Sequence, residues 1–185
     1  MSPKSRGRPP GRGRKKRPAG RGTSASHLRV VRPAQDCWFD DPVPGDRRSW
    51  VMPPAHGTYR GLELEALKPE DDDHLLILLE AYHPELQDAL RAGEDLQVDG
   101  EPVNPRLHLL MHQSVARQLL DDDPPETWQA VRRLAGLGYD WHNITHMIAA
   151  LVTENAWRAQ AEQTPFDPEE YVRQLAELPG DWPAP

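Results

Sequence analysis

The sequence predicts an all-α protein: a compact bundle of about six helices behind a disordered, basic N-terminal tail. Three observations support this fold class. From about residue 60 onward, apolar residues recur with the spacing of one helical face. Cap residues and prolines divide this region into segments of helical length. No stretch shows the strict alternation of apolar and polar residues that is typical of a half-buried strand.

The first two helices are expected on either side of Pro84. Asp71 to Asp73 favour a helix start because negative charge is stabilised at the positive end of the helix dipole. Proline disfavours helical backbone in the residue before it, so the first helix should end near His83. The second should begin at Pro84 and end at Gly93, where glycine can adopt the left-handed conformation.

Four further helices each start at a residue whose side chain can accept a hydrogen bond from a free backbone N–H. In three of them proline follows, which suits the first helical turn. The expected caps are Asn104, Asp123, Asp140 and Asp167. In the helix after Asn104, the apolar positions with helical spacing are Leu107, Leu110, Met111, Val115 and Leu119. The six segments have short connections, as in a compact bundle.

Composition divides the chain into three parts. Residues 1–32 form the basic tail, residues 33–58 a proline-rich linker or arm, and residues 59–182 the helical domain. Prolines should keep the arm from regular structure, although its aromatic residues could clip it onto the domain. Asp99-Gly100 is a turn signal, possible as the tip of a short hairpin.

Charge is distributed very unevenly between the tail and the rest of the chain. The basic tail holds 11 of the 22 Lys and Arg residues and no acidic residue, so its net charge is +11. The remainder has a net charge of −18. A basic segment without apolar residues cannot bury a core, and it is attracted to polyanions. The acidic body should be repelled by them and left free to meet a protein partner.

The single cysteine and the hydropathy pattern indicate which cellular compartment the protein occupies. Cys37 has no partner for an intramolecular disulfide, which is typical of a reducing cytosol. No apolar run approaches the roughly 20 residues that a membrane-spanning helix needs. We therefore expect a cytoplasmic protein without membrane contact, and its basic tail is compatible with association with the nucleoid.

Four of the eight histidines occur as two pairs with a spacing of four residues. His108 and His112 form one pair, and His142 and His146 the other. Side chains four apart lie on one face of a helix, one turn from each other. Both pairs fall on or beside an apolar stripe, so their rings should face the interior. His27, His56 and His74 are expected at the surface.

A third element is Glu80 to His83, a Glu-x-x-His spacing used by carboxylate-bridged helical metal proteins. Imidazole and carboxylate donors suit a divalent ion such as zinc or iron. The predicted ligands are Glu80, His83, His108, His112, His142 and His146. The alternative for these residues is a set of core histidines, each hydrogen-bonded to its own neighbour.

The same pattern excludes two known kinds of zinc site. A zinc-protease signature needs glutamate directly after the first histidine, but those positions hold Leu109 and Asn143. Zinc-finger spacing needs cysteines, and only one is present.

The tail contains a short motif with the sequence Arg6-Gly7-Arg8-Pro9, which resembles an AT-hook. The resemblance implies an Arg-Gly-Arg core lying in an A·T-rich minor groove, whose negative potential attracts arginine. The residues expected to contact nucleic acid, DNA more than RNA, are Arg6, Gly7, Arg8, Pro9, Arg12, Arg14, Lys15, Lys16 and Arg17. The alternative is a basic arm that binds any nucleic acid through counterion release.

The segments "HPEL", "NPRLHLLMHQ", "GYDWHNITHMI" and "FDPEEYVRQLAELP" resemble the bacterial domain-of-unknown-function family 1841. The resemblance covers about residues 60–180 and implies a small helical bacterial protein without a known activity. The basic tail lies outside it.

Three function hypotheses follow. The first is a non-enzymatic, metal-binding helical domain that the tail tethers to nucleic acid. The second is a di-metal protein of iron or manganese with oxygen, redox or hydrolytic chemistry, which would need an open coordination position. The third is a bundle that only binds a protein partner.

Overall fold

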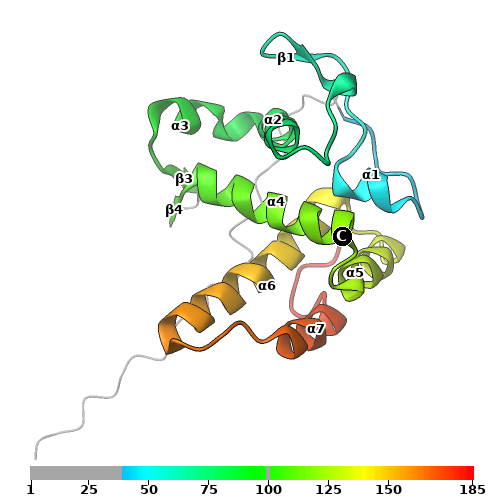
Figure 1. Cartoon of the computed structure of the whole chain (residues 1–185), viewed down its shortest axis with the longest axis vertical. Helices are drawn as coiled ribbons and strands as arrows, with labels where there is room; N and C mark the ends of the chain where they lie inside the picture. Colours follow the sequence, from blue (N-terminus) through cyan, green and yellow to red (C-terminus); the bar gives the residue numbers. More distant parts are fainter. Residues whose placement is uncertain (1–38, 99–100) are drawn as a thin grey trace, which may run out of the picture.

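The computed structural model describes residues 39–98 and 101–185 (Figure 1). The helices are α1 (Arg47–Val51), α2 (Asp72–Tyr82), α3 (Gln87–Ala92), α4 (Pro105–Asp121), α5 (Pro125–Gly136), α6 (Trp141–Glu162) and α7 (Pro168–Glu177). Two 3₁₀ turns, η2 (Leu64–Ala66) and η3 (Pro84–Leu86), precede α2 and α3. The strands are β1 (Thr58–Tyr59), β2 (Leu62–Glu63), β3 (Leu96–Val98) and β4 (Glu101–Val103).

The all-α fold class is confirmed, and the six expected helices correspond to α2 through α7. Helix α1 is additional and lies in the segment where we expected no regular structure. Its cap is Asp46, whose carboxylate accepts a hydrogen bond from the Arg48 N–H at 3.1 Å. Trp50 and Val51 are buried, so packing against the rest of the molecule holds this short helix together.

Most of the predicted caps are in place. Asn104, Asp140 and Asp167 each accept a hydrogen bond from a backbone N–H of the helix that follows. The expectation for α5 was wrong: its cap is Pro124, which makes no side-chain bond, and only Pro125 lies in the first turn. Asp123 stands one residue too early because Pro124 has extended backbone angles.

The two hairpins are very short. Strand β1 pairs antiparallel with β2, and β3 pairs antiparallel with β4, with Val98 opposite Glu101. The expected turn at residues 99–100 lies between β3 and β4 but outside the described residues. An isolated bridge between Phe39 and Ala55 closes the segment that carries α1.

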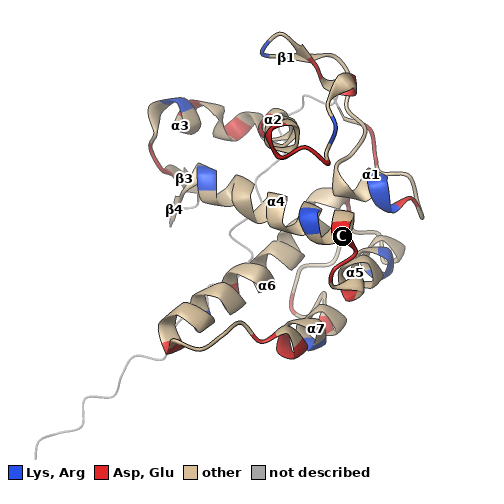
Figure 2. Cartoon of the chain, viewed as in Figure 1, with Lys and Arg blue, Asp and Glu red and all other residues tan. Residues whose placement is uncertain are grey.

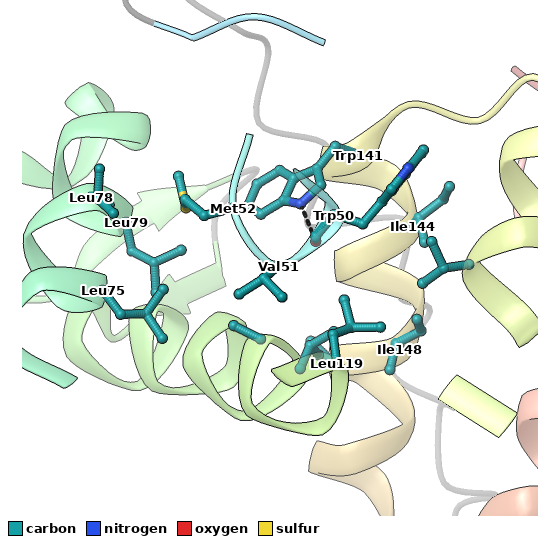
Figure 3. Packing of buried hydrophobic residues seen from close by; sticks show 14 of the residues in the cluster. Trp50, Val51, Met52, Leu75, Leu78, Leu79, Leu119, Trp141, Ile144 and Ile148 are labelled. Carbon is teal, nitrogen blue, oxygen red and sulfur yellow. Dashed lines mark hydrogen bonds between the residues drawn. The ribbon is translucent and has the colours of Figure 1, made fainter. Parts of the chain in front are cut away.

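Helix α4 is the central element of the bundle, in contact with α1, α2, α5 and α6. Figure 3 shows α1 between α2 and α6, with Val51 between leucines of α2 and isoleucines of α6. The indole N–H of Trp141 donates a 2.9 Å hydrogen bond to the carbonyl of Trp50, which fixes α1 to the start of α6. Residues from outside the predicted helical domain therefore complete its core.

The buried face of α4 differs from the predicted one. Leu107 and Leu110 are about half exposed, whereas His108 and His112 are buried together with Val115 and Leu119. Helix α4 is oriented so that its two imidazoles, rather than Leu107 and Leu110, pack toward α6 and the end of α2. The inward orientation of His108 and His112 agrees with the prediction, whereas Leu107 and Leu110 were wrongly assigned to the buried face.

Within residues 39–98 and 101–185, no helix is both long enough and apolar enough to cross a membrane.

Candidate metal centre

Two helices and the end of a third bring five histidines together. His108 and His112 come from α4, His142 and His146 from the first turns of α6, and His83 directly follows α2. All five are at least nine-tenths buried, with His83 and His112 each only 1% exposed. We call these residues the five-histidine cluster.

The caps of α4 and α6 determine where the paired histidines lie along each helix. Asn104 accepts from the Leu107 N–H at 3.0 Å, and Asp140 accepts from the Asn143 N–H at 2.8 Å. Each pair follows within about two turns of its cap. The spacing of four residues then places both rings of a pair on the same inward face.

The rings of the cluster are in mutual contact. Ring centres of His142 and His146 lie 4.0 Å apart, and those of His108 and His112 lie 4.7 Å apart. The two helices meet at His112 and His146, whose ring centres are separated by 4.7 Å. His83 joins them at 4.5 Å from His112. The rings therefore converge on one region of the interior.

Three of the histidines form the tightest group of donor atoms. One ring nitrogen each of His83, His108 and His112 lie within 4.8 Å of one another, a spacing compatible with a shared metal ion. Among the described residues, no hydrogen-bond partner exists for Nε2 of His83, for Nε2 of His108 or for either nitrogen of His112. A buried polar atom without a partner costs about 1–3 kcal/mol, so several together need a reason.

Burial also keeps these rings in the form that binds metals. It lowers the pKa of His83 to about 3 and that of His108 to about 3, where the neighbouring histidines contribute as well. Burial lowers the pKa of His112 well below the ordinary value, again reinforced by the other rings. The three imidazoles are therefore neutral at pH 7, as metal ligation requires.

Glu85 is a component of the site that the sequence did not reveal. Its Oε1 lies 2.8 Å from Nδ1 of His83, because the 3₁₀ turn begun by Pro84 folds the carboxylate back onto the ring. Burial raises the pKa of Glu85, while His142 and His108 lower it. A carboxylate on one ring nitrogen leaves the other nitrogen directed at a metal ion, the arrangement found around many metal-bound histidines.

Glu80, predicted as a ligand, has a different partner. Its Oε2 pairs with the Arg60 guanidinium at 2.8 Å, and it does not belong to the group of converging donors. The Glu-x-x-His spacing would place both side chains on one helical face only if both residues were helical. His83 lies beyond the last residue of α2, so this geometry does not apply. Of the histidines expected at the surface, His56 is exposed and bonds Asp40 at 2.6 Å and Glu65 at 3.2 Å. His74 is partly exposed, and His27 lies outside the described residues.

An aromatic wall of Phe39, Tyr82 and Trp141 borders the cluster. The Tyr82 ring centre lies 4.5 Å from Trp141 and 5.4 Å from His83, and the Phe39 ring packs edge-on against Tyr82 at 4.9 Å. Trp141 also lies 5.8 Å from His112. The wall separates the imidazoles from solvent on that side.

A surface pocket of about 430 Å³ between α1 and α4 is a weaker candidate. It contains Arg47, Arg48 and Arg117, but each is paired with a carboxylate, of Asp122, Glu70 and Asp72 respectively. Figure 2 shows basic positions on α1 and α4 with acidic positions in the segments beside them. Each arginine of the pocket thus already has a carboxylate partner within the protein.

All residues of the predicted nucleic-acid motif, from Arg6 to Arg17, lie outside the described residues.

Fold and site together define a small all-α protein with a buried polyhistidine cluster. The family model described as "Domain of unknown function (DUF1841)" matches residues 61–177, and the chain belongs to that family. The match spans every member of the five-histidine cluster. No curated protein and no solved structure matches the chain.

Proposed function

We propose that the protein is a metal-binding helical domain in which the five-histidine cluster holds a divalent ion. One observation carries the proposal: donor atoms of His83, His108 and His112 gather within 4.8 Å in the interior, and four ring nitrogens there lack a partner among the described residues. A cluster of core histidines would instead be expected to bond to its neighbours, as buried polar groups normally do.

The donor set indicates which ions fit. Neutral imidazole nitrogens suit zinc, iron, nickel and copper, whereas magnesium and calcium prefer oxygen ligands. The Glu85 carboxylate beside His83 partly compensates the charge of a divalent ion. Bound to helices α4 and α6 and to the end of α2, such an ion would cross-link three elements and stabilise the fold.

Metal content tests this proposal directly. The full chain, purified without added metal, should contain about one equivalent of a transition metal by elemental analysis. His112→Leu should lose it, whereas His74→Leu, which changes a histidine outside the cluster, should retain it. Protein that neither retains nor takes up zinc, iron or nickel would refute metal binding. Two irons per chain would instead favour the di-metal alternative with oxygen, redox or hydrolytic chemistry.

A second function is proposed for the basic tail, on the strength of its charge. Eleven positive charges within 32 residues, with no acidic residue, are suited to contact with DNA or RNA phosphates. Arg6-Gly7-Arg8-Pro9 adds a preference for A·T-rich minor grooves in this proposal. The tail would tether the metal-binding domain to nucleic acid, in a cytoplasmic, nucleoid-associated bacterial protein, and the acidic body would remain available to a protein partner.

Two double variants of the full chain separate groove recognition from charge alone. Arg6→Gln with Arg8→Gln should weaken binding to an A·T-rich duplex more than binding to a G·C-rich one. Arg12→Gln with Arg14→Gln removes the same charge outside the complete motif and should weaken both equally. Equal effects of the two double variants would leave only a basic arm. Wild-type protein that binds neither duplex at low salt would refute nucleic-acid binding.

A further inference from the structure

The mutual distances within the five-histidine cluster define a shape. The His112 ring contacts all four others, at centre separations of 4.5 Å from His83, 4.7 Å from His108, 5.9 Å from His142 and 4.7 Å from His146. The other four rings form a closed circuit: His83 to His108 at 4.8 Å, His108 to His146 at 5.0 Å, His146 to His142 at 4.0 Å and His142 to His83 at 5.3 Å. This is a four-sided pyramid with His112 at its apex.

One diagonal of the base is measured as well. The ring centres of His83 and His146 lie 6.4 Å apart, and the two rings are nearly parallel, with an interplanar angle of 18°. Adjacent rings of the base are inclined by larger angles, from 39° for His142 and His146 to 83° for His83 and His108. Imidazoles on opposite sides of one centre have distant ring centres, whereas imidazoles on adjacent sides have close ones. The long diagonal and the short sides of the base follow this pattern.

The dimensions for four of the rings are close to those of a single metal ion, whereas His142 departs from them at 5.9 Å from His112, 5.3 Å from His83 and 4.0 Å from His146. With a metal–nitrogen bond of about 2.1 Å and about 1.2 Å from nitrogen to ring centre, each ring centre lies about 3.3 Å from the ion. Ligands at right angles then have centres about 4.6 Å apart, and opposite ligands about 6.5 Å apart. Four rings around a tetrahedral ion would all be separated by about 5.3 Å, without a long diagonal.

From this arrangement we infer that the cluster is a square-pyramidal site for one ion, with five imidazole ligands and a sixth position opposite His112. The inference rests on the proposed metal-binding function and specifies its ligand number. The favoured ions are late first-row divalent metals that accept five or six nitrogen ligands, such as iron, cobalt and nickel. Zinc in structural sites takes four ligands and fits less well.

Two of the five rings must rotate before all five can bind one ion. The donor atoms of His83, His108 and His112 already lie within 4.8 Å of one another, and those of the α6 pair lie outside this group. His142 and His146 therefore turn about their side-chain torsions on binding. Glu85 bonds to His83, one of the four basal rings, so it lies on the basal side of the pyramid. None of the contacts described joins Glu85 to the apical His112.

Cobalt(II) is the probe for the ligand number, because its visible absorption is weak with five or six ligands and strong with four. Metal-stripped full-length protein should bind one equivalent of cobalt with weak absorption. An intense tetrahedral spectrum would overturn the square-pyramidal inference and leave metal binding intact. No cobalt binding would remove both. X-ray absorption at the cobalt edge should count about five imidazoles, and a count of three or four is the contrary result.

Variants test the two features that go beyond a three-histidine site. His146→Leu should retain cobalt but raise its visible absorption toward that of a four-ligand ion, and His74→Leu should leave the spectrum unchanged. A wild-type spectrum in His146→Leu would show that this ring is not a ligand. Circular dichroism checks that each variant is folded, and the X-ray count on wild-type protein does not depend on them. Azide should shift the wild-type spectrum by entering the sixth position, and the absence of a shift would refute that position.

Discussion

Nδ1 of His83 and Oε1 of Glu85 lie 2.8 Å apart in a partly buried environment, joined by the turn that Pro84 begins. This contact engages one ring nitrogen and leaves the other, Nε2, without a hydrogen-bond partner among the described residues. A carboxylate on one ring nitrogen also makes the imidazole a stronger metal donor. In the proposed site, Glu85 would therefore raise the affinity for the metal without contacting it.

Glu85→Gln should therefore weaken metal binding by about 10–100-fold while leaving all five histidines in place. The amide can still bond to Nδ1 but carries no charge. Competition against a chelator of known affinity measures the change. Glu162→Gln, at the end of α6, is the control and should bind as wild type does. Unchanged affinity in Glu85→Gln would contradict the role assigned to this carboxylate.

The stability of metal-stripped protein should fall as pH falls below about 6.5. Burial lowers the pKa of His83 to about 3 and that of His108 to about 3, whereas unfolded histidine keeps a value near 6.5. Between these values the unfolded chain binds more protons, so the free energy of unfolding decreases by about 1.4 kcal/mol per pH unit for each such histidine. Above about pH 6.5 His83 and His108 are neutral in both the folded and the unfolded chain. They then contribute nothing to the pH dependence of the free energy of unfolding.

Urea unfolding at a series of pH values from about 7 to about 4 measures this slope. His108→Leu removes one of the titrating rings and should give a shallower dependence than wild type. Parallel curves for wild type and His108→Leu would show that the ring does not stay neutral in the folded state.

Trp50→Ala should destabilise the protein strongly. The side chain is 7% exposed, and its removal leaves a cavity beneath α1, which costs about 3–5 kcal/mol for a buried tryptophan. Trp157→Ala is a matched control, because that ring is 69% exposed and its loss should change stability by less than about 0.5 kcal/mol. Denaturant midpoints compare the two, and similar values would place α1 outside the cooperative core.

Asp140→Ala should lower both stability and metal affinity. Its carboxylate accepts from the Asn143 N–H at 2.8 Å and caps α6, so its loss should cost about 1 kcal/mol. Since His142 lies two residues later, fraying of this turn would also displace a proposed ligand. Asp167→Ala removes the corresponding cap of α7 and should destabilise to a similar degree without affecting the metal. Thermal unfolding and chelator competition, applied to both variants, separate the two effects.

The helices and the convergence of the histidines could be predicted because both have a periodic signal. Caps such as Asn104 and Asp140 set the helix starts, and a spacing of four placed each pair on one face. Helix α1 could not be predicted, because its five residues are stabilised by distant contacts of Trp50 rather than by a local pattern. Glu85 carried no signal either, since a carboxylate two residues after histidine approaches it only in the turn that Pro84 produces.

The inward side of α4 carries rings where an ordinary bundle would carry leucines, while Leu107 and Leu110 face solvent. Five leucines in place of the cluster would bury a similar volume without the cost of unpaired nitrogens. We expect such a protein to be more stable and unable to bind a metal ion. The unpaired ring nitrogens are therefore a burden on folding that leucines would not impose, and in our proposal a bound metal ion offsets that burden.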